Sequence, residues 1–224
     1  MAPRHDVPEP SDGSQDPRPL RACWLGWIAV DTVDQAGVVE MLGLAPRRAL
    51  SWRAAAELVD DVAHSSALRF SVVVVTPPIS GWTLVIGPWC GLIYEQNVTR
   101  VTESCRALSA RFGRAQAYFH SEQGDGEAWL LTVHGEVIRR WISTDPGLAL
   151  GNPAGVERRR LDAFGIEGYP EDLDPDDDPL SDWSAGWGDC DALTIAAESS
   201  LDPTAFNSRT TAPGAVLVAH LYPE

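Results

Sequence analysis

The pattern of hydrophobic and polar positions is best defined between residues 70 and 141. Residues 70–75 (FSVVVV) are apolar almost without interruption, which is typical of a strand buried on both faces at the centre of a sheet. A Pro-Pro pair ends this strand because proline cannot donate a ladder hydrogen bond, and the following Ser-Gly turns the chain into a second strand over 82–86. The pattern predicts a hairpin inside a sheet.

The next segments predict a helix and two further strands. Apolar residues step by three and four over 98–112, with Asn97 as the expected N-cap and Gly113 as the end of the helix. Residues 115–119 and 128–133 are predicted to pair as strands, joined by a polar loop over 120–127.

A second hairpin is predicted at His134 and Gly135, a pair that favours positive φ and would return 136–142 beside the preceding strand. A two-residue turn at this point places Trp129 opposite Arg140, and we expect a structural cation–π contact between them.

Weaker patterns outside this region complete the expected fold. They predict a strand over 23–30, a helix over 34–42, a helix opened by Ser51, a helix from Asp189 to Ser199 and a buried strand over 215–222. Together the elements predict an α+β fold, with an antiparallel or mixed sheet of about six to seven strands and three to four helices packed on it.

The domain organisation follows from where the pattern is lost. Residues 1–20 are rich in Pro, Asp and Ser and are expected to be a disordered tail, and 21–224 form a single domain with a long acidic loop near 143–187. No secretory h-region and no apolar run of membrane-spanning length is present, so a cytoplasmic protein is expected.

Composition narrows the classes of partner. The net charge is −15 and the sequence pI is about 4.6, which disfavours binding to nucleic acid and to anionic membranes. A basic protein partner, or simple solubility, fits this charge better. The four cysteines form no CxxC pair, so buried reduced thiols are expected. We expect no metal and no cofactor; the oligomeric state is left open.

Familiar catalytic signatures are missing from the sequence. It contains no GxSxG elbow, no HExxH, no GxGxxG after a strand and, because all 17 basic residues are Arg, no lysine to complete a Walker loop. Common hydrolases and nucleotide-dependent enzymes are therefore disfavoured.

The loop over 120–127 and the last hairpin hold the residues best suited to acid–base chemistry. An imidazole and carboxylates at a sheet edge can transfer protons or bind a divalent cation, although hairpin loops are also polar for solubility. The candidate catalytic residues are His120, Glu122, Asp125, Glu127, Arg139 and Arg140.

A second candidate surface lies in the poorly patterned acidic segment. Its alternating carboxylates resemble an EF-hand loop, but Asp177 stands where Gly is needed and Trp183 where a bidentate Glu is needed. A solvated acidic loop beside two tryptophans outside the predicted core is typical of a protein-binding surface, and the alternative is that the tryptophans cover the core. The candidate binding residues are Asp172, Asp174, Asp176, Asp178, Trp183 and Trp187.

Three segments, TPPISGWTLVIG, CRALSARFGRAQAYF and AWLLTVHGEVIRRW, together resemble a pattern of uncharacterised actinobacterial proteins. They span about a third of the chain. Their residues are those of strands, a helix and a hairpin, so the resemblance implies a shared fold and no catalytic assignment.

Two functional hypotheses follow. The first is a binding or accessory protein that engages a protein partner, as an immunity-like or regulatory factor, through the acidic segment and its tryptophans. The second is an enzyme without a familiar motif that tailors or cyclises a natural product or peptide, with a pocket over the sheet.

Overall fold

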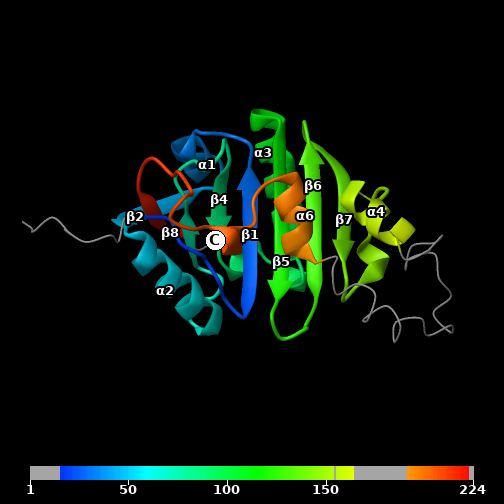
Figure 1. The fold of residues 1–224 in the computed structure, drawn as a ribbon, viewed down its shortest axis with the longest axis horizontal. Helices are drawn as coiled ribbons and strands as arrows, with labels where there is room; N and C mark the ends of the chain where they lie inside the picture. Colours follow the sequence, from blue (N-terminus) through cyan, green and yellow to red (C-terminus); the bar gives the residue numbers. More distant parts are fainter. Residues whose placement is uncertain (1–15, 154, 164–190, 222–224) are drawn as a thin grey trace, which may run out of the picture.

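The computed structural model describes residues 16–153, 155–163 and 191–221, and its centre is an eight-stranded antiparallel sheet (Figure 1). The strands follow the order β2-β8-β3-β4-β1-β5-β6-β7. Their bounds are β1 (Trp24–Val30), β2 (Leu44–Leu50), β3 (Val72–Val75), β4 (Thr83–Ile86), β5 (Arg114–Ser121), β6 (Glu127–Val133), β7 (Glu136–Ile142) and β8 (Val216–Leu221). The predicted α+β class is confirmed, and the sheet has more strands than the six to seven expected.

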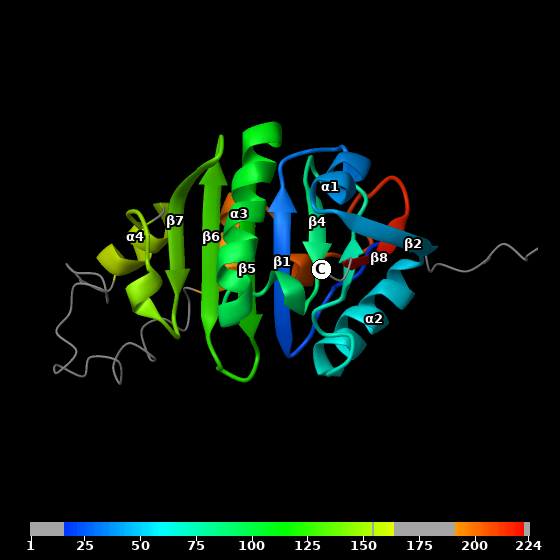
Figure 2. The same ribbon diagram turned by 180° about the vertical axis from the view of Figure 1, so that it is seen from behind.

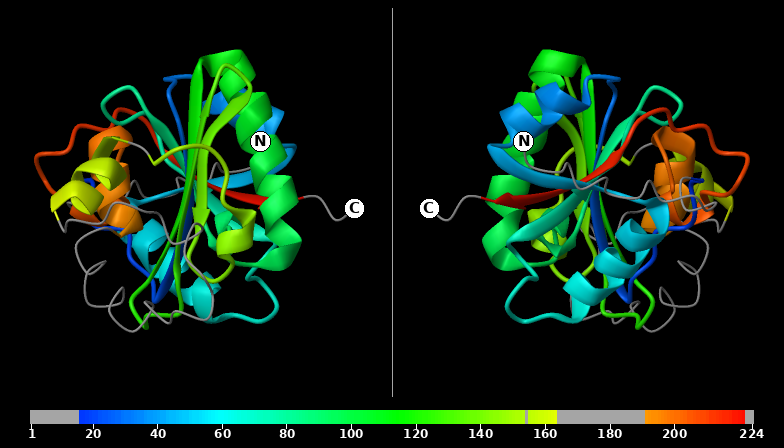
Figure 3. Two further views of the ribbon diagram at one scale, coloured as in Figure 1. Left: turned by 90° about the vertical axis from the view of Figure 1, so that its right-hand side faces the viewer. Right: turned by 90° about the vertical axis from the view of Figure 1, so that its left-hand side faces the viewer.

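Helices cover both faces of this sheet. They are α1 (Gln35–Met41), α2 (Trp52–His64), α3 (Glu95–Phe112), α4 (Gly155–Ala163) and α6 (Ala192–Ser199), with short 3₁₀ turns η1 (Pro88–Cys90), η2 (Pro146–Leu148) and η5 (Pro203–Ala205). In the edge-on views of Figure 3, α2, α4 and α6 lie on one side, called here the first face, and α1 and α3 lie on the other, called the second face. Figure 2 shows the second face, where α3 lies in front of the sheet.

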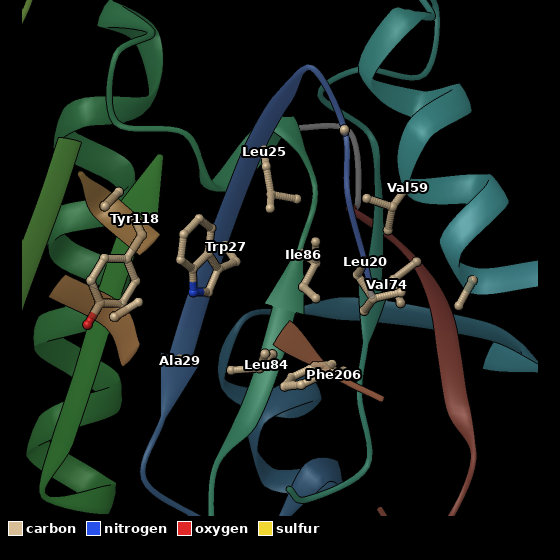
Figure 4. Close-up of a cluster of buried hydrophobic side chains, with 14 of the residues drawn as sticks. Leu20, Leu25, Trp27, Ala29, Val59, Val74, Leu84, Ile86, Tyr118 and Phe206 are labelled. Atoms are coloured by element: carbon tan, nitrogen blue, oxygen red, sulfur yellow. The ribbon is translucent and has the colours of Figure 1, made fainter. Parts of the chain in front are cut away.

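Strand β1 separates two hydrophobic cores by simple alternation. Leu25, Trp27 and Ala29 point to the first face, whereas Ile28 and Val30 point to the second. On the first face, Trp27 stacks on Tyr118 with ring centroids 5.0 Å apart (Figure 4). Burial on both faces explains why the central strands lack an amphipathic pattern.

Helix starts follow the expected capping chemistry at Ser51 and depart from it at two other helices. Ser51 accepts a hydrogen bond from the Ala54 amide, as predicted for the helix that it opens. Asp34 is the N-cap of α1 and accepts a hydrogen bond from the Gly37 amide. Asn97, however, is not an N-cap: α3 begins at Glu95, and the buried Asn97 amide donates to the carbonyls of Pro88 and Gly91.

The cap of α6 also differs from the prediction. Asp191 accepts a hydrogen bond from the Thr194 amide at 2.7 Å and is the N-cap, in place of the expected Asp189. Farther along, Asp202 caps the short turn η5, in which proline occupies the first position.

The β6–β7 hairpin has the expected turn but a shifted register. His134 and Gly135 both have positive φ, as predicted. A bulge between Leu131 and Thr132 shifts the pairing by one residue in the part of the hairpin farther from the turn. Trp129 therefore faces Trp141 instead of Arg140. The expected Trp129–Arg140 contact is therefore wrong; Arg139 lies over the Trp141 ring, 5.6 Å from its centroid.

Strand β2 was not predicted from the sequence. Its residues, LAPRRAL, include a proline and show no alternation, yet they pair with β8 at one edge of the sheet. A proline and a bulge are compatible with an edge strand because one side of its backbone has no ladder to complete.

The N-terminal segment contributes to the core. Leu20 is fully buried, and its amide donates to the Pro203 carbonyl at 3.0 Å. Packing on the first face therefore includes Leu20, one residue before the expected start of the domain at residue 21. Among the described helices, none has both the length and the apolarity needed to cross a membrane.

Candidate functional site

The candidate site is built where strands β5 and β6 meet their connecting loop. These strands extend to Ser121 and from Glu127, so the loop is shorter than the expected 120–127. His120 and Glu127 are direct cross-strand partners, and their side chains share the first face with Tyr118 and Trp129.

Glu127 connects this pair to helix α6. One carboxylate oxygen, Oε1, lies 2.8 Å from His120 Nδ1, and the other, Oε2, accepts a hydrogen bond from the Ala192 amide at 2.9 Å. The Ala192 amide belongs to the first turn of α6, where backbone amides have no acceptor within the helix. A carboxylate is also favoured at this positive end of the helix dipole. Glu127 thereby fixes the orientation of the imidazole.

The electrostatic environment favours the charged form of His120. Burial opposes protonation, but the hydrogen bond and the charge of Glu127, together with the charges of Asp191 and Glu122, outweigh it and raise the pKa of His120 above 6.5. The two side chains are only 17% and 23% exposed, so the pair is weakly screened by solvent.

A cavity of about 210 Å³ opens beside His120. It is lined by Arg21, Ala22, Leu25, His120, Glu122, Leu193 and Thr204. With Nδ1 held by Glu127, Nε2 is the ring nitrogen left for a ligand, and it has no hydrogen bond within the described residues. The arrangement can take up or release a proton at the wall of a small cavity.

The other predicted acid–base residues lie away from this cavity. Asp125 accepts a hydrogen bond from the Trp24 indole at 2.6 Å, and Trp24 packs with the core of the second face. Arg140 is also on the second face, where its Nε donates to the Leu148 carbonyl at 2.8 Å. Arg139 is buried beneath α4 with Glu157. The structure therefore brings together His120, Glu122 and Glu127.

A metal-binding role for the hairpin residues gains no support from their arrangement. Within the described ranges, no group of three or more His, Cys, Asp or Glu side chains is placed to hold a metal ion.

The predicted binding residues Asp172, Asp174, Asp176, Asp178, Trp183 and Trp187 lie outside the described residues.

Acidic and basic residues are distributed unevenly along the chain. Residues 164–190 contain nine of the 32 acidic residues and none of the 17 basic ones, whereas the described residues hold 19 acidic and 16 basic residues. The flanking helices α4 and α6 contact each other, and Arg159 pairs with Glu198 across them.

Sequence reasoning missed two polar residues of the cavity, Arg21 and Thr204, and also Asp191, whose charge acts on His120. Arg21 and Thr204 come from distant segments, and nothing in their local sequence indicates that they meet His120. Asp191 could have been found from the sequence, because an Asp preceding an apolar helix is a recognisable N-cap.

Comparisons with known proteins add no relative: no family model, curated protein or solved structure matches this chain.

Proposed function

We propose that this protein binds a small polar molecule in the cavity beside His120 and transfers a proton on it. The observation that carries the proposal is the His120–Glu127 pair, in which a carboxylate holds Nδ1 at 2.8 Å while the ring lines the cavity. This is the arrangement by which a carboxylate orients a histidine base and stabilises the imidazolium that forms.

The chemistry follows from the state of the ring. When His120 is neutral with its proton on Nδ1, Nε2 carries the lone pair and can accept a proton from an acidic N–H or O–H bond of the bound molecule. The bonding electrons stay on the molecule, and the resulting imidazolium returns the proton to another atom of it. A pKa raised by Glu127 and nearby carboxylates brings this exchange closer to neutral pH. An enzyme that tailors or cyclises a small molecule or peptide end fits this role.

The proposal is tested by incubating the purified protein with a small-molecule extract and following compound masses and the His120 ring resonances by NMR. We expect at least one compound to shift the His120 resonance and to be converted by the wild type. Conversion should fall at least about 100-fold in His120→Gln. Glu136→Gln, an exposed carboxylate change on β7, is the control. If no compound moves the His120 resonance and none is converted, the proposal is wrong.

A second candidate function is binding of a basic protein partner, in an immunity-like or regulatory role in the cytoplasm. The observation that favours it is the concentration of nine carboxylates, with Trp183 and Trp187, in residues 164–190 of a chain whose described part is nearly balanced in charge. Such charge speeds encounter with a basic partner, and tryptophan supplies buried contact area.

Matched charge variants test this second function by affinity purification. Changing Asp172, Asp174 and Asp176 to Asn should lose a partner captured by the wild type. Changing Glu57, Asp60 and Asp61 on α2 to their amides alters the net charge equally and should retain it. Equal loss in both triple variants, or capture of nothing by the wild type, would contradict a specific role for the segment.

A further inference from the structure

The cavity beside His120 carries two opposite charges that do not pair with each other. Arg21 and Glu122 both line it, and both side chains are solvent-accessible. Neither forms an ion pair or a side-chain hydrogen bond with any other described residue. Two charged side chains on the strands are paired instead: Arg114 binds Asp31 at 2.8 Å, and Arg139 binds Glu157 at 3.1 Å.

The remainder of the lining limits the size and shape of a ligand. Leu25, Leu193 and Ala22 provide apolar surface from β1, α6 and the N-terminal segment. The volume of about 210 Å³ is below the roughly 300 Å³ at which pockets for larger ligands begin. The cavity therefore suits a small molecule with an apolar end.

From these features we propose that the cavity binds a small zwitterion of the α-amino-acid type with a short aliphatic side chain. The Arg21 guanidinium would bind the carboxylate, for which its fork of N–H donors is suited. Glu122 would bind the ammonium, and the aliphatic part would contact Leu25 and Leu193. The inference rests on the site of the proposed function, but it requires only binding and no proton transfer.

His120 has a defined place in this assignment. His120 lines the cavity together with Arg21 and Glu122, and Leu25, its cross-strand partner on β1, lines it as well. His120 can therefore accept a proton from the ammonium of the bound zwitterion. That step would produce the neutral amine that a tailoring or cyclising reaction needs as its nucleophile.

The test measures the binding of three probes to the full chain. The probes share one aliphatic group and differ in charge. They are L-leucine, 4-methylpentanoate, which lacks the ammonium, and 3-methylbutylamine, which lacks the carboxylate. We expect leucine to shift the methyl resonances of Leu25 and Leu193 with a Kd of about 1 mM or below, and each single-charge analogue to bind at least about fivefold more weakly. An analogue that binds as tightly as leucine would overturn the zwitterion assignment.

Variants separate the two charged groups. Arg21→Gln and Glu122→Gln should each weaken leucine binding at least about fivefold. Arg53→Gln and Glu136→Gln, which change exposed residues elsewhere, should leave it unchanged. All four side chains are exposed, and equal thermal unfolding of the variants excludes loss of fold as the cause.

Failure of this inference is distinct from failure of the proposed function. If none of the three probes moves a cavity resonance, the zwitterion assignment is overturned, while compounds of another charge in the extract still decide whether His120 binds and converts a ligand. If leucine binds as expected but His120→Gln changes no reaction, the ligand class stands and the proton-transfer role falls.

Discussion

Arg139 and Glu157 form an ion pair in which both side chains are fully buried, with Arg139 Nε 3.1 Å from Glu157 Oε1. Arg139 Nη1 also donates to the Gly151 carbonyl at 3.0 Å. The pair joins β7 to α4 on the first face of the sheet. Because hydrogen bonds from Arg139 to backbone carbonyls accompany the ion pair, the cost of removing both charges from water is partly offset.

Removing one partner of this pair should be severely destabilising. Glu157→Leu removes a buried carboxylate that pairs with the buried Arg139 charge, and we expect the free energy of unfolding to fall by about 3–5 kcal/mol. Denaturant titration of the variant and the wild type measures the change.

The exposed pair Arg159–Glu198 is the matched control, since it also involves α4. Glu198→Gln should change the free energy of unfolding by no more than about 1 kcal/mol, because solvent screens an exposed ion pair. If Glu157→Leu and Glu198→Gln lowered the free energy of unfolding by similar amounts, the prediction that the buried pair matters more than the exposed pair would be wrong.

The fold was predictable wherever local chemistry and burial agreed. Ser51 caps its helix as its sequence predicts, and His134-Gly135 adopts the positive φ of a tight turn. The bulge between Leu131 and Thr132 was not predictable, because the sequence of a strand alone is compatible with either register. The register is set by how the strand packs against its partner. Strand β2 was missed because its stability comes from pairing with β8, which is distant in the chain.

The candidate site was predictable only in part, for a similar reason. His120 and Glu127 stand seven positions apart, and their contact requires β5 and β6 to continue to the loop. Arg21 reaches the same cavity from the N-terminal segment. Local pattern can propose acid–base residues, but it cannot say which of them share a cavity, and so Arg139 and Arg140 were grouped with His120 although they serve packing.

Gly26 should tolerate no side chain. A Cβ at this position would lie 2.8 Å from the Gly91 backbone nitrogen and 3.0 Å from the Gly87 carbonyl oxygen, and backbone cannot move aside cheaply. We expect Gly26→Ala to lower the free energy of unfolding by about 1–3 kcal/mol in denaturant titration. In Gly155→Ala the nearest atom is the flexible Arg159 Nη1 at 3.4 Å, so that variant should be neutral or stabilised by up to about 1 kcal/mol.

The His120–Glu127 pair should make stability depend on pH in a defined direction. The pKa of His120 is raised in the folded state, so its contribution is complete below the unfolded value of about 6.5 and is lost as pH rises through the folded value. The difference in free energy of unfolding between wild type and Glu127→Gln should therefore be largest near pH 5.5 and shrink toward pH 8.5. Thermal or urea unfolding at several pH values measures it.

Glu136→Gln is the control for this pH series because Glu136 is exposed and forms no ion pair with a described residue. Its difference from wild type should not vary over the same range. NMR titration supplies an independent check: the His120 pKa should be lower in Glu127→Gln than in the wild type. An unchanged His120 pKa in Glu127→Gln would refute the assigned cause.

Cys90 and Cys105 should resist alkylation in the folded protein, although both are free thiols. Both are completely buried in the core of the second face, and burial raises the pKa of each, which suppresses the reactive thiolate as well as access to it. Cys23 is partly exposed and should react with iodoacetamide at pH 8 at least about tenfold faster, as measured by mass spectrometry of the peptides. In denaturant the three rates should become similar, because unfolding removes both the barrier to access and the pKa difference. Equal rates in the native protein would show that this core opens readily, in conflict with its packing.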